Sequence, residues 1–130
     1  MVHLSGQLPY VDGRLEITGS VGDTLTIEEA QVAARLCALN ALGALVAEIG
    51  TLARVRQVVR LTGYVAAAAG FDAHPRVMDG ASAALLDYLG DRGRHARTAI
   101  GVRNLPHNAP VEVDLIVAID SHATRPGSAR

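Results

Sequence analysis

The last apolar segment of the chain, residues 111–119 with the sequence VEVDLIVAI, places the strongest constraint on the fold. Its alternate positions are all aliphatic: Val111, Val113, Leu115, Val117 and Ile119. Because successive side chains of a strand point to opposite faces, these positions predict one continuous apolar face. Ile116 and Ala118 add apolar surface to the other face. A strand of this composition is expected to be covered on both sides.

Two helices are predicted to cover it. Residues 26–50 begin with Thr26 and Glu29 at the spacing of a capping box and end at Gly50. Apolar residues recur there at intervals of three and four, which predicts a buried stripe made of Val32, Leu36, Leu39, Leu42, Val46 and Ile49. Residues 71–90 predict the second helix, with a stripe made of Val77, Met78, Ala81, Leu85, Tyr88 and Leu89.

Strands are predicted for the remaining segments. Residues 2–10 alternate apolar and polar side chains, residues 11–19 contain an Asp-Gly turn, and residues 54–67 are apolar on both faces at their centre. Residues 98–104 and 110–118 flank a short loop and predict a terminal hairpin. The order β-β-α-β-α-β-β indicates an α+β fold, in which two helices cover only one face of the sheet. The second apolar face therefore predicts a homo-oligomer that packs sheet against sheet.

Composition excludes several classes of function. The 130 residues predict a single domain over 1–120, followed by a disordered tail over 121–130. A net charge of −1, an aromatic content of 3% and the lack of Trp argue against a nucleic-acid surface. No apolar run is expected to reach the about 20 residues of a membrane span, and no signal peptide precedes the first strand, so a soluble cytoplasmic protein is expected. The single Cys37 predicts a buried free thiol, and the histidines lack metal-ligand spacing, so no metal site is predicted.

Three stretches resemble one known family. They are SGQLP at 5–9, VVRLTGYV at 58–65 and GRHARTAIGVRNLPHNAPVEVDLIVAI at 93–119. Together they resemble the YjgF-type Rid family of reactive-intermediate deaminases, and most closely a branch with the motif G-R-H-A-R-x-A-x-G-V. The resemblance implies a chorismate-mutase-like subunit with a mixed β-sheet and two helices on one face. It also implies a homotrimer whose sheets form a central barrel, with ligand clefts between the subunits.

The start of the chain departs from this family. Members usually carry a longer segment before S-G-Q, including a first strand and an aromatic residue that helps to wall the cleft. Here the motif starts at Ser5, shortly after Met1. The strand is therefore expected to be missing from the domain at 1–120, either because the protein lacks it or because this sequence starts late. The wall of the pocket that this segment supplies in the family is expected to be missing with it.

The resemblance also implies the site residues and the reaction. The family's carboxylate-binding arginine falls on Arg97, and the glutamate that holds water falls on Glu112. Gly6 matches a glycine whose backbone lines the pocket, and Ala99 stands where well-studied members have a cysteine that contributes its backbone. The implied reaction hydrolyses enamines and imines such as 2-aminoacrylate to 2-keto acids and ammonia, without metal or organic cofactor.

The two charged residues suit this chemistry. Arginine presents a planar fork that grips a carboxylate with two hydrogen bonds, and a partly buried glutamate can orient water and relay protons. In a simple hairpin of 98–104 with 110–118, Arg97 and Glu112 would lie roughly 15 Å apart. A shared site is therefore expected to form across a subunit interface.

Two other functions remain open at this point. A non-catalytic, regulatory binder of small carboxylates or keto acids would use Arg97 without turnover, and some family members are described as endoribonucleases or translation inhibitors. His95 is expected to be an exposed loop histidine. Arg54, Arg56 and Arg60 are expected to share one strand face, where they could attract an anion or pair with acidic residues of another subunit.

Overall fold

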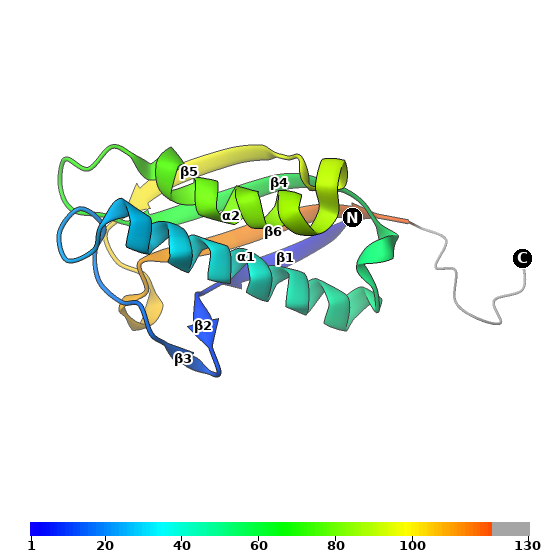
Figure 1. Ribbon diagram of the computed structural model, residues 1–130, viewed down its shortest axis with the longest axis horizontal. Coiled ribbons are helices and arrows are strands. Elements are labelled where there is room, and N and C mark those ends of the chain that lie inside the picture. The colour runs from blue at the N-terminus through cyan, green and yellow to red at the C-terminus, as the bar shows by residue number, and fades with distance from the viewer. Residues whose placement is uncertain (121–130) are drawn as a thin grey trace, which may run out of the picture.

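The computed structural model describes residues 1–120 and confirms an α+β fold (Figure 1). Its elements are β1 (Val2–Gln7), β2 (Tyr10–Val11), β3 (Arg14–Leu15), α1 (Ile27–Ile49), η1 (Leu52–Arg54), β4 (Val55–Ala66), α2 (His74–Leu89), η2 (Gly90–Gly93), β5 (Ala96–Val102), η3 (Pro106–Asn108) and β6 (Val111–Ile119). The tail predicted over 121–130 lies outside the described residues.

The main sheet has the strand order β1-β6-β4-β5 and is mixed. Strand β6 runs antiparallel to both β1 and β4, whereas β5 runs parallel to β4. The predicted hairpin of 98–104 with 110–118 is therefore wrong, because β4 lies between β5 and β6. The loop is long enough to cross one strand, and the interior position buries the apolar face of β6 better than an edge would.

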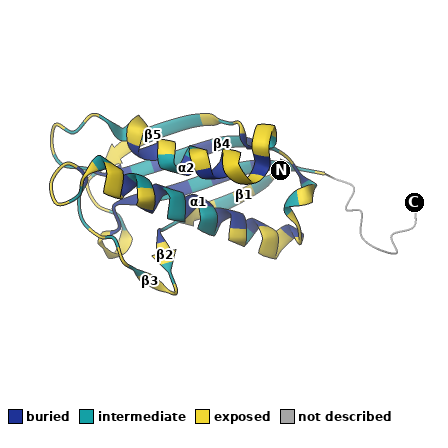
Figure 2. Cartoon of the chain, in the orientation of Figure 1, coloured by how far each residue is buried: buried dark blue, intermediate teal, exposed yellow. Residues whose placement is uncertain are grey.

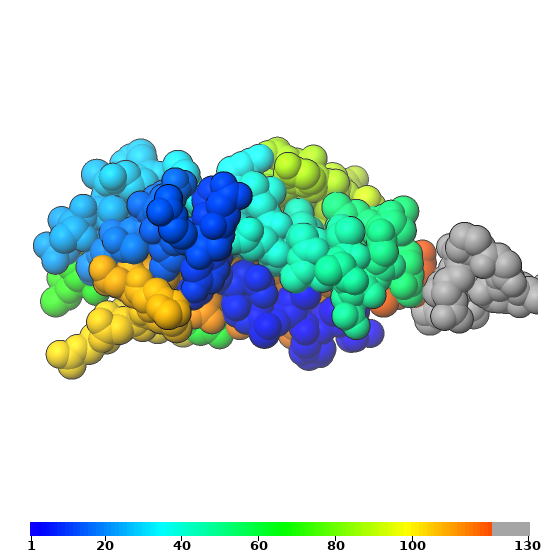
Figure 3. Space-filling view, turned by 90° about the horizontal axis from the view of Figure 1, so that it is seen from below, coloured from blue at the N-terminus to red at the C-terminus, as the bar shows by residue number. Residues whose placement is uncertain are grey.

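That loop is fixed on the molecule at its η3 turn. The backbone N–H of Gly19 donates to the carbonyl of Asn108 at 3.0 Å. Figure 3 shows the yellow-to-orange loop beside the blue segment that precedes α1. The crossing from β5 to β6 is thus supported by a segment from the other end of the chain.

Both helices lie on one face of the sheet, as predicted (Figure 1). The core lies between them and the inward side chains of the central strands, which include the buried Leu61 of β4 and Leu115 of β6. Figure 2 shows dark blue on the inward sides of the helices and yellow on their outward sides. The opposite face of the sheet is half-buried at Glu112, Asp114 and Ile116, and no helix covers it in residues 1–120.

Helix α1 is where the capping box predicted it, but it buries a different face. The Thr26 backbone donates to Glu29 at 2.9 Å, and the Thr26 hydroxyl accepts from the Glu29 N–H at 3.1 Å. Val32 and Val46 are 55% and 37% exposed, so the predicted stripe is partly wrong. The buried residues are Ala30, Ala33, Ala34, Cys37, Ala38, Ala41, Leu42, Leu45 and Ile49. Small side chains let the helix approach the sheet and α2 closely.

The composition of α1 follows from this packing. By length and composition alone, the 23-residue helix could cross a membrane, since an 18-residue window within it has a mean hydropathy of 1.6. In the described structure the helix instead contacts β6, β1 and α2. Its apolar side chains are therefore accounted for by the core that they form.

The three arginines around the start of β4 do not share a face. Two bulges interrupt the alternation of β4, and Arg54 lies before the strand in η1. Arg54 donates to the carbonyl of Asp120, Arg56 lies 3.9 Å from the Asp120 carboxylate, and Arg60 donates to the Thr98 hydroxyl. The predicted alignment is wrong for Arg54, which precedes the strand, whereas the two bulges of β4 together restore the alternation by Arg60.

Candidate functional site

Arg97 is anchored to α2 from the edge strand β5. It pairs in register with Leu61, whose side chain is buried under the helices. The Arg97 Nη1 donates to Asp79 Oδ1 at 3.0 Å and to Ser82 Oγ at 3.2 Å. The Arg97 side chain is 25% exposed and that of Asp79 is 60% exposed. The guanidinium is thus held at the rim of the molecule, where solvent and ligands can reach it.

Glu112 lies on the opposite face of the sheet. Its neighbours Val111 and Val113 are fully buried under the helices, so the alternation of β6 turns Glu112 outward. The carboxylate lies against Gly6 of β1: a Cβ atom at that position would stand 1.8 Å from Glu112 Oε2. Gly6 is therefore the residue that leaves room for this carboxylate position.

The surroundings of Glu112 favour its protonated form. Partial burial, and then the neighbouring Asp114, raise the pKa of Glu112 above its ordinary value. The Tyr64 hydroxyl donates to Asp114 Oδ2 at 3.0 Å, and this hydrogen bond is the main cause of the raised pKa of Tyr64. A glutamate with a raised pKa can take up and release a proton more readily near neutral pH.

The predicted site residues form two groups within one chain. Arg97 and Ala99 lie together on β5, on the side of the sheet that faces α2, whereas Gly6 and Glu112 lie together on the other face. One strand separates β5 from β6, and the two registers are offset by three residues, which gives about 14 Å between the Arg97 and Glu112 backbones. One small ligand cannot contact both side chains of a single chain.

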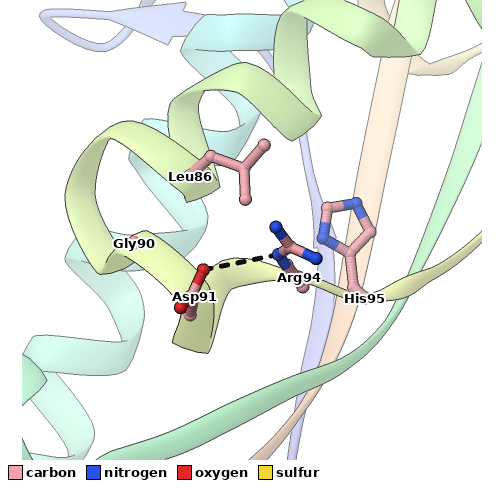
Figure 4. Close-up of a pocket in the computed structure, with 5 residues that line it drawn as sticks. All are labelled: Leu86, Gly90, Asp91, Arg94 and His95. Atoms are coloured by element: carbon pink, nitrogen blue, oxygen red, sulfur yellow. Dashed lines mark ion pairs between the residues drawn. The ribbon is translucent and has the colours of Figure 1, made fainter.

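A pocket of about 500 Å³ adjoins the Arg97 group. It is lined by Leu86, Gly90, Asp91, Arg94 and His95 (Figure 4). Figure 4 shows Arg94 and His95 side by side below Leu86, with an ion pair between Arg94 and Asp91 at 3.4 Å. The pocket is open and polar on one side, with an aliphatic side chain on the other.

His95 is not the exposed loop histidine that the sequence predicted. It is half-buried, with Nε2 at 2.8 Å from Ser82 Oγ and Nδ1 at 2.5 Å from the carbonyl oxygen of Gly93. Asp79 and Ser82 were not among the site residues predicted from the sequence. Their spacing of three residues on a helix, beside a strand that carries Arg97, was the available signal.

The described residues contain no set of side chains that could bind a metal ion. Among residues 1–120, no three His, Cys, Asp or Glu side chains come close enough to hold a metal ion. Burial raises the pKa of the Cys37 thiol, so that it stays protonated and unreactive. The candidate chemistry therefore rests on Arg97, Glu112 and their neighbours.

Comparison with known proteins agrees with this architecture. The profile of the family described as "YjgF/chorismate_mutase-like, putative endoribonuclease" matches residues 1–119. The chain belongs to the YjgF-type Rid family. Protein TCP17 of Trypanosoma cruzi is 43% identical over 121 residues, which cover 92% of this chain and 76% of TCP17.

Two crystal structures of similar proteins are close in fold. Atu1372 of Agrobacterium tumefaciens, a protein of unknown function, superposes with a TM-score of 0.89 at 44% identity, covering 91% of this chain and 75% of Atu1372. A protein of Shewanella oneidensis named a "putative endoribonuclease" superposes with a TM-score of 0.87 at 36% identity, covering 90% of this chain and 78% of that one. The chorismate-mutase-like subunit fold is thereby confirmed.

Proposed function

We propose that the protein is a Rid-type deaminase that hydrolyses 2-imino acids to 2-keto acids and ammonia. The anchored guanidinium of Arg97 carries this proposal. Its Nη1 has two N–H groups, and these are used by Asp79 and Ser82. In residues 1–120 no acceptor takes Nη2 or Nε, so this edge of the fork is available to a substrate carboxylate.

Glu112 would activate the attacking water and transfer its proton. Addition of water to the C=N carbon gives a carbinolamine, which loses its nitrogen as ammonia while the carbon becomes a ketone. Glu112 accepts a proton from the attacking water and returns it to the departing nitrogen, a role that its raised pKa favours. No oxidant, reductant or metal is needed for this balance.

The two groups would meet across an interface in a homotrimer. Arg97 and Glu112 lie on opposite faces of one sheet, so the Arg97 of one copy is paired with the Glu112 of another. The face without helices carries Tyr64, Ile116 and the exposed Ile100, which is 43% exposed. A barrel of three sheets would cover this apolar surface.

A non-catalytic carboxylate binder is the second candidate. Asp79 lies 3.0 Å from Arg97 and offsets part of its charge, which weakens the grip on an incoming anion. RNA cleavage, suggested by the name of the Shewanella relative, has less support, because residues 1–120 contain one Phe and three Tyr and no Trp for base stacking.

The test is an assay in which 2-aminoacrylate and 2-iminobutanoate are generated in situ and keto-acid release is followed. Acceleration by the wild type that Arg97→Ala abolishes, and Glu112→Gln lowers by about 10²-fold or more, supports the proposal. Arg14→Ala, an exposed arginine on the β2–β3 hairpin, is the control and should stay active. A folded wild type that does not accelerate release refutes deaminase activity, and binding of 2-oxobutanoate that depends on Arg97 would then favour the binder.

A further inference from the structure

The GRHAR motif places a chain of hydrogen bonds behind Arg97. Its links are the Arg97 Nη1 to Ser82 Oγ at 3.2 Å, Ser82 Oγ to His95 Nε2 at 2.8 Å, and His95 Nδ1 to the Gly93 carbonyl at 2.5 Å. Asp79 accepts the second bond of the same Nη1 at 3.0 Å. The chain runs from the interior of the subunit to the proposed carboxylate site.

The direction of each link follows from its two ends. A guanidinium can only donate, so Ser82 Oγ accepts from Arg97 and its own hydrogen points to His95 Nε2. A carbonyl can only accept, so the proton of the neutral His95 ring lies on Nδ1, facing Gly93. The opposite tautomer would turn a lone pair toward the carbonyl oxygen of Gly93.

The backbone holds the far end of this chain in place. Gly93 is buried, and a Cβ atom there would stand 2.3 Å from the backbone carbonyl oxygen of Leu85. The η2 turn therefore lies directly against α2. This contact fixes the position of the Gly93 carbonyl relative to Ser82, which is in α2. Ala81 and Ala84 are buried on either side of Ser82 in the sequence, so the helix cannot rotate without disturbing the core.

We propose that Ser82 and His95 are positioning residues that keep Arg97 open for side-on carboxylate binding, an inference that rests on the proposed function. With Ser82 holding one N–H of Nη1, Asp79 receives only the other. Without Ser82 the guanidinium can rotate, and Asp79 can then take Nη1 and Nη2 together as a bidentate pair. Nη2 would be lost to the ligand, whose carboxylate needs the Nη2–Nε edge.

The experiment compares KM and kcat for 2-iminobutanoate in a set of variants. Ser82→Ala should raise KM about tenfold with little change in kcat, because it weakens carboxylate binding in ground state and transition state alike. Ser82→Thr keeps the hydroxyl group and should have the wild-type KM. His95→Ala should raise KM by roughly threefold, since the Ser82 hydroxyl loses its orientation but stays present. In an Asp79→Asn background Ser82→Ala should have almost no effect, since the amide cannot compete as a carboxylate does.

Arg14→Ala is again the control, because Arg14 is an exposed arginine that lies outside both the chain of bonds and the pocket. Nitrogen-15 NMR of the histidine rings gives a second readout that does not require activity: the neutral His95 ring should carry its proton on Nδ1. A ring protonated on Nε2, or a Ser82→Ala variant with the wild-type KM, overturns the positioning role while leaving the deaminase function standing. A wild type without turnover and without binding of 2-oxobutanoate refutes the proposed function, and with it this role.

Discussion

The contact between α1 and α2 gives opposite predictions for two glycine-to-alanine substitutions. Gly80 is in the interior of α2, where a Cβ atom would stand 2.2 Å from the backbone oxygen of Gln31 in α1. Gly43 is in the interior of α1 and is exposed, with no atom within 4 Å of the corresponding position. Both substitutions raise helix propensity by about 1 kcal/mol, so they differ only in the collision.

Gly43→Ala should therefore stabilise the protein by about 0.5–1 kcal/mol. In Gly80→Ala the clash involves backbone on both helices, so they must separate by about 1 Å, and overpacking of this kind costs about 1–3 kcal/mol. Because the atom struck is backbone, the cost is expected in the upper half of this range. After the gain of about 1 kcal/mol in propensity, Gly80→Ala should be about 1–2 kcal/mol less stable than wild type, or roughly 4–7 °C lower in Tm.

The measurement is equilibrium unfolding in guanidinium chloride at one protein concentration, with Tm as a second probe. A fixed concentration is needed because association would add to the apparent stability. Wild-type or higher stability of Gly80→Ala would show that the helices separate freely, and would refute the close packing inferred from the alanine-rich face of α1. A loss of stability in Gly43→Ala would refute the assumption that its outer side is open.

Three further predictions concern the sheet and the helix start. Gly6→Ala should leave Tm within a few degrees of wild type, because the Glu112 side chain is flexible and can move away. The carboxylate must move by about 1.6 Å, from 1.8 Å to a normal contact of 3.4 Å, which should lower kcat by up to about 10²-fold in the keto-acid assay. Full activity would refute the placement of Glu112. Asp114→Asn should lower the pKa of Tyr64 toward 10, which absorbance titration of the tyrosines measures. Because the folded-state pKa of Tyr64 is raised, the stability that this bond contributes is present below pH 10 and is lost as the pH rises through the folded-state pKa. An unchanged titration curve would contradict the hydrogen bond. Thr26→Ala should cost about 1 kcal/mol in the same denaturant experiment, since it removes the capping box, and a change below 0.3 kcal/mol would contradict that role.

Local signals in the sequence predicted the local structure well. The capping pair Thr26 and Glu29 located the start of α1, and Gly50 located its end. The face of α1 was less predictable, because a stripe of large aliphatic residues and a stripe of alanines both fit a helical period. The packing of α1 against β6, β1 and α2 decides which stripe is buried, and contacts such as that of Gln31 with Gly80 join helices far apart in the sequence.

The site shows the same division between local and long-range information. Sequence motifs were enough to predict Arg97 and Glu112 as site residues. The pairing of β5 with β6 was predicted only because the two segments are close in the chain, and it is wrong. The structure places β4 between them, a choice made by burial across the whole sheet rather than by the loop. The helical spacing of Asp79 and Ser82 places both on one helix face, but the hydrogen bond of Ser82 with His95 depends on how α2 packs beside β5 and has no local signal.

The position of β6 has a consequence for biosynthesis. It is the last strand of the described chain, yet it lies between β1 and β4, and Val2 pairs with Val117. While the ribosome is still making the protein, β1 has no neighbour in this sheet and one side of β4 is open. The two helices then have only an incomplete surface to pack on, so the domain is expected to fold only after β6 has left the ribosome, with its apolar strands exposed until then.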